Sequence, residues 1–343
     1  MLVVRNLCLV TSLLLASAGC VARSESDVVV YSALDQEFAK PILQSFQRAT
    51  DDEVTVVAKY DIESTKTVGL VNQILAESKR PQCDVFWNNE IMHTVRLQQK
   101  GLLLPRSWNV EPGWPQDMIA SDGTWCGFAA RARVLLINTD MIGDDDVAPN
   151  SVDDLIDPRW KSKCAIARPL FGTTATHLAV LKSVNGRDET LRWLGEVCRN
   201  AIVLSGNKQV AQAVSSGQLA WGLTDTDDAN IERERGYPVR IVFPDQQPDQ
   251  PGTLRIPNTI AVLKDAPHPV AAGRLANFLV RPEIEDRLAM GESSQMPIST
   301  QTKFPPAVLP QEPVRWMRVD FESAAEDWDG WNVEVKKTLE ENG

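Results

Sequence analysis

The strongest constraint on the fold of this chain is a regular alternation of short β-branched apolar runs with stretches of helical hydrophobic spacing. Residues 28–31 form a continuous apolar run typical of a buried strand, and residues 36–49 place their apolar side chains at helical intervals. The same alternation continues to a helical stretch at 269–279. It predicts an α/β protein with a largely parallel sheet.

The length of the chain predicts more than one compact unit. It has 343 residues, and a single hydrophobic core rarely grows past about 250–300 residues. The extended stretch at 125–138 is expected to leave one α/β unit and enter the next, and the strand at 240–243 to be the return crossing. We therefore expect two lobes. The first comprises residues 28–130 and 244–343, including the C-terminal helices, and the second comprises residues 131–243.

The first twenty residues have the composition of a secretory signal. Arg5 supplies a positive start, an apolar run follows, and the small residues before Cys20 end it. The run is shorter than the roughly 20 apolar residues that a permanent membrane span needs. We interpret residues 1–20 as a signal peptide and residues 21–27 as a tether. A lipoprotein signal, with a lipid on Cys20, is preferred over ordinary cleavage after residues 16–18.

The charge of the chain restricts its partners. The formal net charge is −11, and the sequence has no run rich in lysine and arginine. A nucleic-acid partner is therefore not expected. The signal predicts a periplasmic or other extracytoplasmic location, with membrane contact only through the lipid anchor, and we expect a monomer.

Export permits disulfides. Apart from Cys8 and Cys20, the chain has four cysteines, for which three pairings are possible: Cys83, Cys126, Cys164 and Cys198. The pairs Cys83–Cys126 and Cys164–Cys198 are favoured because each would stay within one lobe. The alternative is four free buried thiols. A zinc site is not expected, since the chain has neither a CxxC pair nor clustered histidines.

Four loops rich in short polar side chains follow predicted strands, at 31–35, 87–90, 171–177 and 224–228. Ligands of open α/β sheets bind at the carboxyl ends of the strands, where loops lead into helix N-termini. Helix capping by serine and threonine is the alternative explanation for such loops. The candidate ligand-binding residues are Tyr31, Ser32, Asp35, Asn88, Asn89, Arg131, Arg133, Thr173, Thr174, Asn207 and Thr226.

The fourth loop carries three carboxylates within four residues, at Asp225, Asp227 and Asp228. Like charges this close need a counter-charge, or one of the carboxylates stays protonated. A metal cation, a ligand ammonium group or a nearby arginine, Arg131 or Arg133, would serve. The alternative is a solvated acidic turn.

Seven segments together resemble a known family. They are VVVYSALD, CDVFWNNE, QKGLLLP, ARARVLLINTD, DLIDPRWKSKCAIARP, GQLAWGLTDTDD and IPNTIAVLKDAPHP, in this order over about residues 28–300. This order is similar to that of the bacterial extracellular solute-binding proteins of ABC importers, in particular the group with the ferric-iron-binding proteins. The resemblance implies a two-lobed type II periplasmic-binding fold with a ligand cleft between the lobes, closure on the ligand and docking to an ABC permease.

The resemblance leaves the ligand open. Ferric-binding members hold iron with several tyrosine oxygens, including an adjacent pair, and often with an anion bound by arginine. Here Thr226 and Asp227 stand where the tyrosine pair would fall, and Asp35 stands where the family often has histidine. Tyr31, Glu90 and one of the two arginines can be carried over.

Carboxylates are hard oxygen ligands that suit Fe(III), Mn, Ca or Mg. The candidate metal ligands are Tyr31, Glu90, Asp225 and Asp227. The expected function is to capture iron(III) or another metal ion, with or without a bound anion, and to deliver it to the permease. The alternative is a small organic anion or zwitterion, such as a phosphonate or an amino-acid-like molecule. The chain lacks the common catalytic motifs, so we expect neither an enzyme nor a catalytic cofactor.

Overall fold

The computed structural model describes residues 27–61, 67–143 and 147–342. The predicted signal peptide, the tether up to residue 26 and the lipidation site Cys20 lie outside the described residues.

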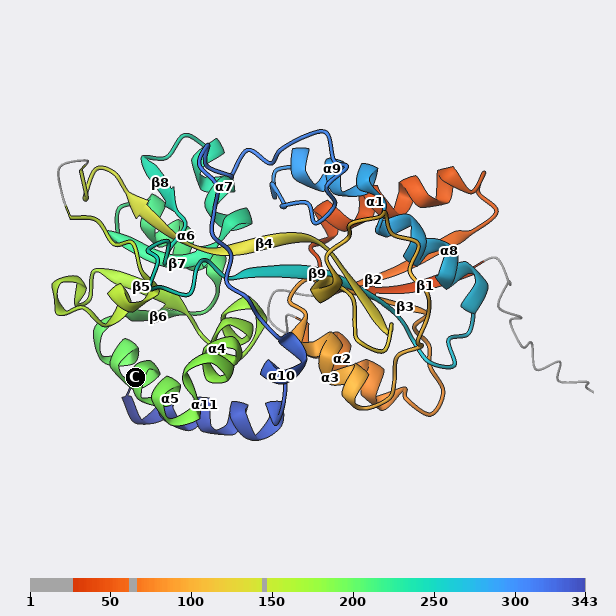
Figure 1. The fold of residues 1–343 in the computed structure, drawn as a ribbon, viewed down its shortest axis with the longest axis horizontal. Coiled ribbons are helices and arrows are strands. Elements are labelled where there is room, and N and C mark those ends of the chain that lie inside the picture. Colours follow the sequence, from red (N-terminus) through yellow and green to blue (C-terminus); the bar gives the residue numbers. More distant parts are fainter. Residues whose placement is uncertain (1–26, 62–66, 144–146, 343) are drawn as a thin grey trace, which may run out of the picture.

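The molecule has two α/β lobes that share one continuous sheet (Figure 1). The strands follow one another across it in the order β2-β1-β3-β9-β4-β7-β5-β6, and β8 pairs with β4. The strands are β1 (Asp27–Ser32), β2 (Thr55–Tyr60), β3 (Val85–Asn88), β4 (Trp125–Asn138), β5 (Cys164–Ala167), β6 (Ile202–Leu204), β7 (Trp221–Asp225), β8 (Val239–Val242) and β9 (Arg255–Val262). The predicted two-lobed α/β fold is confirmed.

Helices cover the sheet of each lobe. They are α1 (Gln36–Ala49), α2 (Val68–Ala76), α3 (Met92–Gln99), α4 (Gly172–Asn185), α5 (Arg187–Asn200), α6 (Asn207–Ser215), α7 (Thr226–Glu234), α8 (Pro269–Leu279), α9 (Pro282–Met290), α10 (Phe321–Ala324) and α11 (Trp328–Asn342). Short 3-10 turns lie at Gln116–Met118, Val152–Ile156 and Pro158–Trp160.

The long strand β4 joins the lobes. Its first half pairs with β9 and its second half pairs with β7 and β8, always antiparallel. Every residue of β4 is buried except Arg131, which is partly exposed. A strand that is covered on both faces has a continuous apolar sequence, which explains why this segment lacks polar alternation.

The return crossing differs from the expected one. Residues 239–242, as β8, pair entirely with the second-lobe half of β4. The chain returns instead through β9, whose first residue Arg255 pairs with Ala132 in the middle of β4. The lobes are therefore joined by β4 and β9, side by side (Figure 1).

The C-terminal helices do not all belong to the first lobe, to which residues 244–343 were assigned. Helix α10 contacts both α3 and α4, and α11 packs on α5 of the second lobe. Trp331 and Val335 of α11 share a hydrophobic cluster with Leu194 of α5. Arg187 of α5 also lies 2.9 Å from Glu334. The apolar face of α11 is thus buried against the second lobe.

The predicted disulfides are wrong, because all four cysteines are free thiols. Strand β9 lies between β3 and β4, so Cys83, next to β3, is at least two strand spacings, or roughly 10 Å, from Cys126. A disulfide does not span that distance. Cys164 packs in a cluster with Trp221, whereas Cys198 lies against a different cluster. Burial raises the pKa of the Cys164 thiol to about 12.

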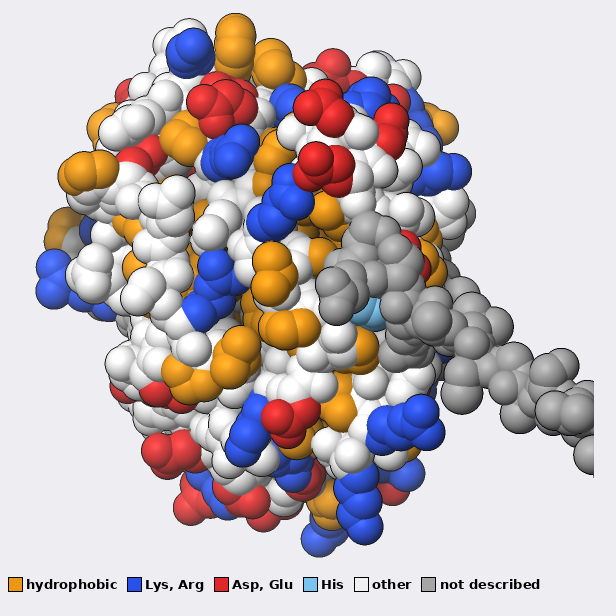
Figure 2. Space-filling view, turned by 90° about the vertical axis from the view of Figure 1, so that its right-hand side faces the viewer, with side chains coloured by type: hydrophobic (Ala, Val, Ile, Leu, Met, Phe, Trp, Pro, Cys, Tyr) orange, Lys and Arg blue, Asp and Glu red, His pale blue; other side chains and the backbone are white. Residues whose placement is uncertain are grey.

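The face of the first lobe in Figure 2 carries acidic and basic side chains interspersed with scattered hydrophobic ones. Interspersed charges of both signs produce a weaker field than a patch of one sign.

Within the described ranges, every helix is too short or too polar to cross a membrane.

The free thiols give the first testable prediction. Cys83, Cys126, Cys164 and Cys198 should all react with iodoacetamide in denaturant without prior reduction, because none is consumed by a disulfide. Peptide mass spectrometry of the alkylated protein checks this. A cross-linked peptide containing two of these cysteines would contradict the structure. The midpoint of thermal unfolding should also be the same with and without a reducing agent.

Candidate functional site

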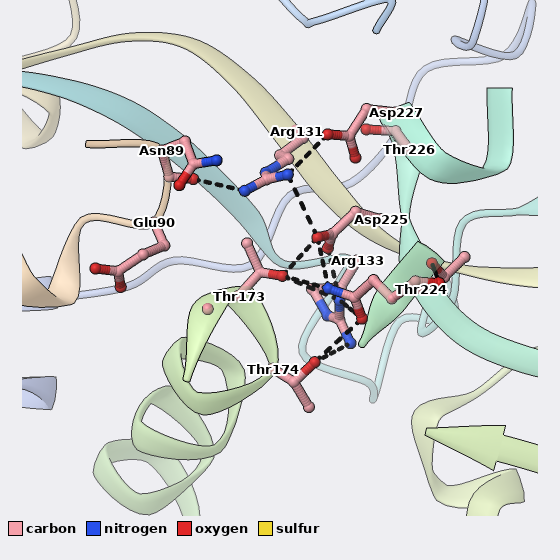
Figure 3. Close-up of polar contacts among 12 residues, drawn as sticks. Asn89, Glu90, Arg131, Arg133, Thr173, Thr174, Thr224, Asp225, Thr226 and Asp227 are labelled. Carbon is pink, nitrogen blue, oxygen red and sulfur yellow. Dashed lines mark hydrogen bonds and ion pairs between the residues drawn. The ribbon is translucent and has the colours of Figure 1, made fainter. Parts of the chain in front are cut away.

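Two arginines of β4 and two aspartates at the junction of β7 and α7 form a polar cluster where the lobes meet (Figure 3). Arg131 and Arg133 are two residues apart, so their side chains leave the same face of the strand. Arg133 is directly paired with Asp225 in the antiparallel register of β4 and β7. The register therefore places opposite charges side by side.

Arg133 and Asp225 form a fully buried ion pair, with 2.6 Å between Nη1 and Oδ1. The other oxygen of Asp225 accepts hydrogen bonds from the Thr173 hydroxyl at 2.5 Å and from the Asn207 amide at 2.8 Å. Arg133 also donates to Thr173, Thr174 and Asn207. A charge withdrawn from water this completely requires such compensation. The pair thereby fixes the N-termini of α4 and α6 to β4.

Arg131 connects the two lobes. Its Nη1 lies 2.7 Å from Oδ2 of Asp227 and 3.7 Å from Oδ2 of Asp225. Its Nη2 donates to the backbone oxygen of Asn89 at 2.9 Å, in the loop that follows β3 of the first lobe. Thr226 accepts a hydrogen bond from the amide of Ala132 at 3.1 Å, which holds the start of α7 against β4.

The two aspartates differ in their proton affinity. Burial alone would raise the pKa of Asp225, but the charges of Arg133 and Arg131 outweigh it and hold this pKa below its ordinary value. The pKa of Asp227 is raised, because burial, assisted by the charge of Asp225, outweighs the attraction of Arg131. Asp225 is therefore a structural anion, and Asp227 is the carboxylate whose charge is less well compensated.

The cluster retains unused binding capacity among the described residues. Carboxylate oxygens of Asp225, Asp227 and Asp228 lie within 4.8 Å of one another. Oδ1 of Asp227 is buried without a hydrogen-bond partner, and so are the Nε atoms of Arg131 and Arg133. The site thus offers an acceptor for a cation and donors for an anion.

His177 lies one turn beyond Thr173 on α4 and is not among the site residues predicted from the sequence. Burial, followed by the charge of Arg133, lowers the pKa of His177 to about 3. Its imidazole is therefore neutral beside the cluster at physiological pH. The spacing of four residues from Thr173 was the available signal, because residues four apart share a helix face.

Several predicted site residues of the first lobe lie elsewhere. The hydroxyl of Tyr31 donates to Glu77 at 3.1 Å and accepts from Gln73 at 2.7 Å, within a hydrophobic cluster. The Ser32 hydroxyl donates to the backbone oxygen of Leu34. Asp35 is exposed at the start of α1. The structure does not bring these three side chains to the cluster of Asp225 and Asp227.

Asn88 and Glu90 lie at the end of β3, with side chains that bind protein atoms. The Asn88 amide donates to Glu90 and Thr94. The Glu90 carboxylate accepts the backbone N–H groups of Met92 and His93, both at 3.1 Å. Figure 3 shows Glu90 directed away from the aspartates. The structure therefore does not place Glu90 among the candidate metal ligands.

The buried ion pair yields a stability prediction. Asp225→Asn leaves the Arg133 charge buried and uncompensated, so the free energy of unfolding should fall by about 3–5 kcal/mol. Adding Arg133→Met to it should recover part of this loss, because no buried charge then remains at the pair. Urea unfolding of both single variants and the double variant provides the double-mutant cycle. Additive effects would show that the two residues do not stabilise each other.

His177 gives a pH prediction. Its folded pKa is about 3, well below the ordinary 6.5, so below pH 6.5 the unfolded chain binds a proton that the folded protein does not. The free energy of unfolding should therefore fall as pH drops from 6.5 towards 3, by up to about 1.4 kcal/mol per pH unit. The His177→Gln variant should show a shallower fall in urea titrations across this range. An equally steep fall in the variant would mean that His177 is protonated in the folded state.

Comparisons with known proteins agree on one family. A sequence profile described as bacterial extracellular solute-binding protein matches residues 93–324. The Fe(3+)-binding periplasmic protein of Serratia marcescens is 29% identical over 219 residues, or 63% of this chain and 61% of that protein. The chain thus aligns with less than two thirds of the Serratia protein. The major ferric iron-binding protein of Neisseria meningitidis is 26% identical over 278 residues, or 79% of this chain and 81% of that protein.

The iron-bound HitA protein from Pseudomonas aeruginosa has the same fold. Its structure superposes with a TM-score of 0.76 at 23% identity, and the match covers 91% of this chain and 99% of HitA. The fold is therefore the type II periplasmic-binding fold. The family is one of binding proteins, which confirms the expectation that the chain is not an enzyme. Since the profile matches more than half of its length, this chain belongs to the bacterial extracellular solute-binding protein family.

Proposed function

We propose that this protein is the substrate-binding component of an ABC importer and that its cargo is iron(III) or another metal ion that prefers oxygen ligands, bound with a small anion. The observation that supports a cation is the group of three carboxylates within 4.8 Å, one of which has a buried oxygen without a partner. Hard cations select such oxygen ligands. The relatives named for ferric iron in Serratia and Neisseria favour iron(III) among these ions.

The charges of the cluster suggest how an anion would take part. Arg131 occupies Oδ2 of Asp227 at 2.7 Å, so a metal ion bound by Asp227 competes with this guanidinium. An anion can compensate the arginine that the metal ion displaces. The metal ion would then compensate the charge of Asp227, and the anion would compensate the charge of Arg131. Each would favour the binding of the other, because no buried charge is left without a partner.

The proposed ligands of the metal ion are Asp225, Asp227 and Asp228. Asp225 is already bound by Arg133, Thr173 and Asn207, so we expect Asp227 to contribute most. The N-terminus of α4, with Thr173 and Thr174, lies beside the arginines. Its free N–H groups favour an anion. This end of the site is the proposed position of the anion.

The cellular setting completes the proposal. Residues 1–20 would direct export, and Cys20 would carry a lipid that holds the protein at the outer face of the cytoplasmic membrane. The protein would act there as a monomer and deliver its cargo to the permease.

A small organic anion or zwitterion is the second candidate. The observation that favours it is the pair of buried Nε atoms of Arg131 and Arg133, which have no partner among the described residues. An acidic group of the ligand would bind the arginines and Thr173, and an ammonium group would bind Asp227. Such a ligand satisfies both kinds of unused group at once.

The metal proposal predicts a specific loss in the Asp227→Asn variant. Its affinity for Fe(III) presented as citrate should fall at least about tenfold, since even residues behind the metal ligands commonly contribute 10–100-fold. Titration calorimetry with Fe(III)-citrate, citrate alone and a set of divalent ions provides the measurement. The Asp249→Asn variant is the matched control, because Asp249 is an exposed carboxylate, and it should bind as the wild type does.

The same proteins separate the two candidates. If no metal ion produces heat or a thermal shift, and mass spectrometry of gently purified protein releases an organic acid, the metal proposal fails and the second candidate holds.

A further inference from the structure

One hydrogen-bonded contact joins the two lobes beside the site without belonging to it. Thr176 lies one turn into α4 of the second lobe. Its hydroxyl is within hydrogen-bonding distance of the Glu90 backbone oxygen, at 2.9 Å, and of the Glu90 carboxylate, at 3.0 Å. Glu90 follows β3 of the first lobe. Both residues are at most 1% exposed, so the contact is shielded from water.

Glu90 is held rigidly for this contact. Its carboxylate accepts the backbone N–H groups of Met92 and His93 and the side-chain amide of Asn88. It therefore caps the N-terminus of α3 with bonds that lie entirely within the first lobe. Thr176 adds a donor from the opposite lobe to a carboxylate that is already in position.

The backbone next to Glu90 is strained. Ile91 is buried and has a φ of 60°, a left-handed conformation that is unfavourable for a β-branched residue. Strained residues of this kind persist where the surrounding structure enforces them, often at binding and switching sites. Here the strained residue directly follows Glu90, which contacts Thr176 of α4.

The contact can open without leaving a buried group unpaired. The Thr176 hydroxyl also lies 3.3 Å from the backbone oxygen of Gly172, in its own helix. If the lobes rotate apart about β4 and β9, this hydroxyl can bind Gly172, and Glu90 keeps its three donors from the first lobe. Rotation of the lobes apart at this point would therefore break the Thr176–Glu90 bond and leave both side chains paired.

We propose that Thr176 and Glu90 form a closure latch, a pair of positioning residues that sets how long the closed protein retains its ligand without touching the ligand. The same loop reaches the site through the backbone oxygen of Asn89, which accepts from Arg131, and Arg131 in turn binds Asp227. The movement that forms the latch therefore also brings Asn89 into contact with Arg131 of the charged cluster. The role of the latch in ligand retention rests on the proposed binding function, whereas its effect on the open and closed populations does not.

The Thr176→Val variant tests the latch because valine has the shape of threonine but no hydroxyl. The dissociation rate of iron presented as Fe(III)-citrate, followed by stopped-flow intrinsic fluorescence, should rise about fivefold, the effect of one net hydrogen bond. The association rate should stay unchanged, since the bond is absent from the open protein. Thr176→Ser keeps the hydroxyl and should restore the wild-type dissociation rate.

Thr190→Val is the matched control. Thr190 is equally buried and makes the same kind of bond within a helix, from its hydroxyl to the Gly186 backbone oxygen at 2.9 Å, but it lies in α5. It should leave both rates unchanged. An equal rise in the dissociation rate in Thr190→Val would assign the effect to helix stability and overturn the latch.

Small-angle scattering of the ligand-free proteins provides a readout that needs no ligand. Thr176→Val should have a larger radius of gyration than the wild type, and Thr176→Ser should not, because loss of the latch favours the open state. If the wild type binds no iron, the proposed cargo fails while the scattering still decides the latch. A radius of gyration for Thr176→Val equal to that of the wild type would overturn the latch.

Discussion

The buried ion pair between Arg133 and Asp225 is the constraint on which the site depends. Both side chains are almost completely withdrawn from water, so each must be satisfied by protein groups. This requirement brings Thr173, from the start of α4, and Asn207, from the start of α6, to the same place. The convergence of loops at the carboxyl ends of the second-lobe strands thus has a specific electrostatic cause.

Arg131 is the residue of the cluster whose contacts a ligand would change. It differs from Arg133 in being partly exposed and in binding the less well compensated carboxylate, Asp227. In the proposed function, a cation would replace it at Asp227, and an anion would then bind the released guanidinium. In the second proposal, a zwitterion would bind the same groups. The two proposed kinds of ligand, a metal ion with an anion and a zwitterion, are therefore alternative ways to complete one charge distribution.

The fold could be predicted from the sequence because hydrophobic periodicity is a local property, and the acidic loop and its arginine partners were visible as residue types. The disulfide pairing could not be predicted, since β9, from residue 255 onwards, inserts between β3 and β4. The face of the sheet to which the Tyr31 side chain points could not be predicted from the sequence either. Strands covered on both faces have no polar side to reveal which residues face the cleft. The position of α11 on the second lobe likewise depends on a long-range contact, with Leu194.

The contacts between the two lobes connect the charged cluster to the proposed closure of the protein. A ligand shifts the balance between open and closed states only through contacts that differ between them. The aspartates lie in the second lobe, whereas the backbone oxygens of Asn89 and Glu90 lie in the first, and they accept from Arg131 and Thr176. A ligand that reorganises Arg131 would therefore alter a bond between the two lobes, whereas the Thr176–Glu90 bond involves no side chain of the charged cluster. In this proposal the charged cluster determines selectivity, and the Thr176–Glu90 contact determines how long the closed protein retains its ligand.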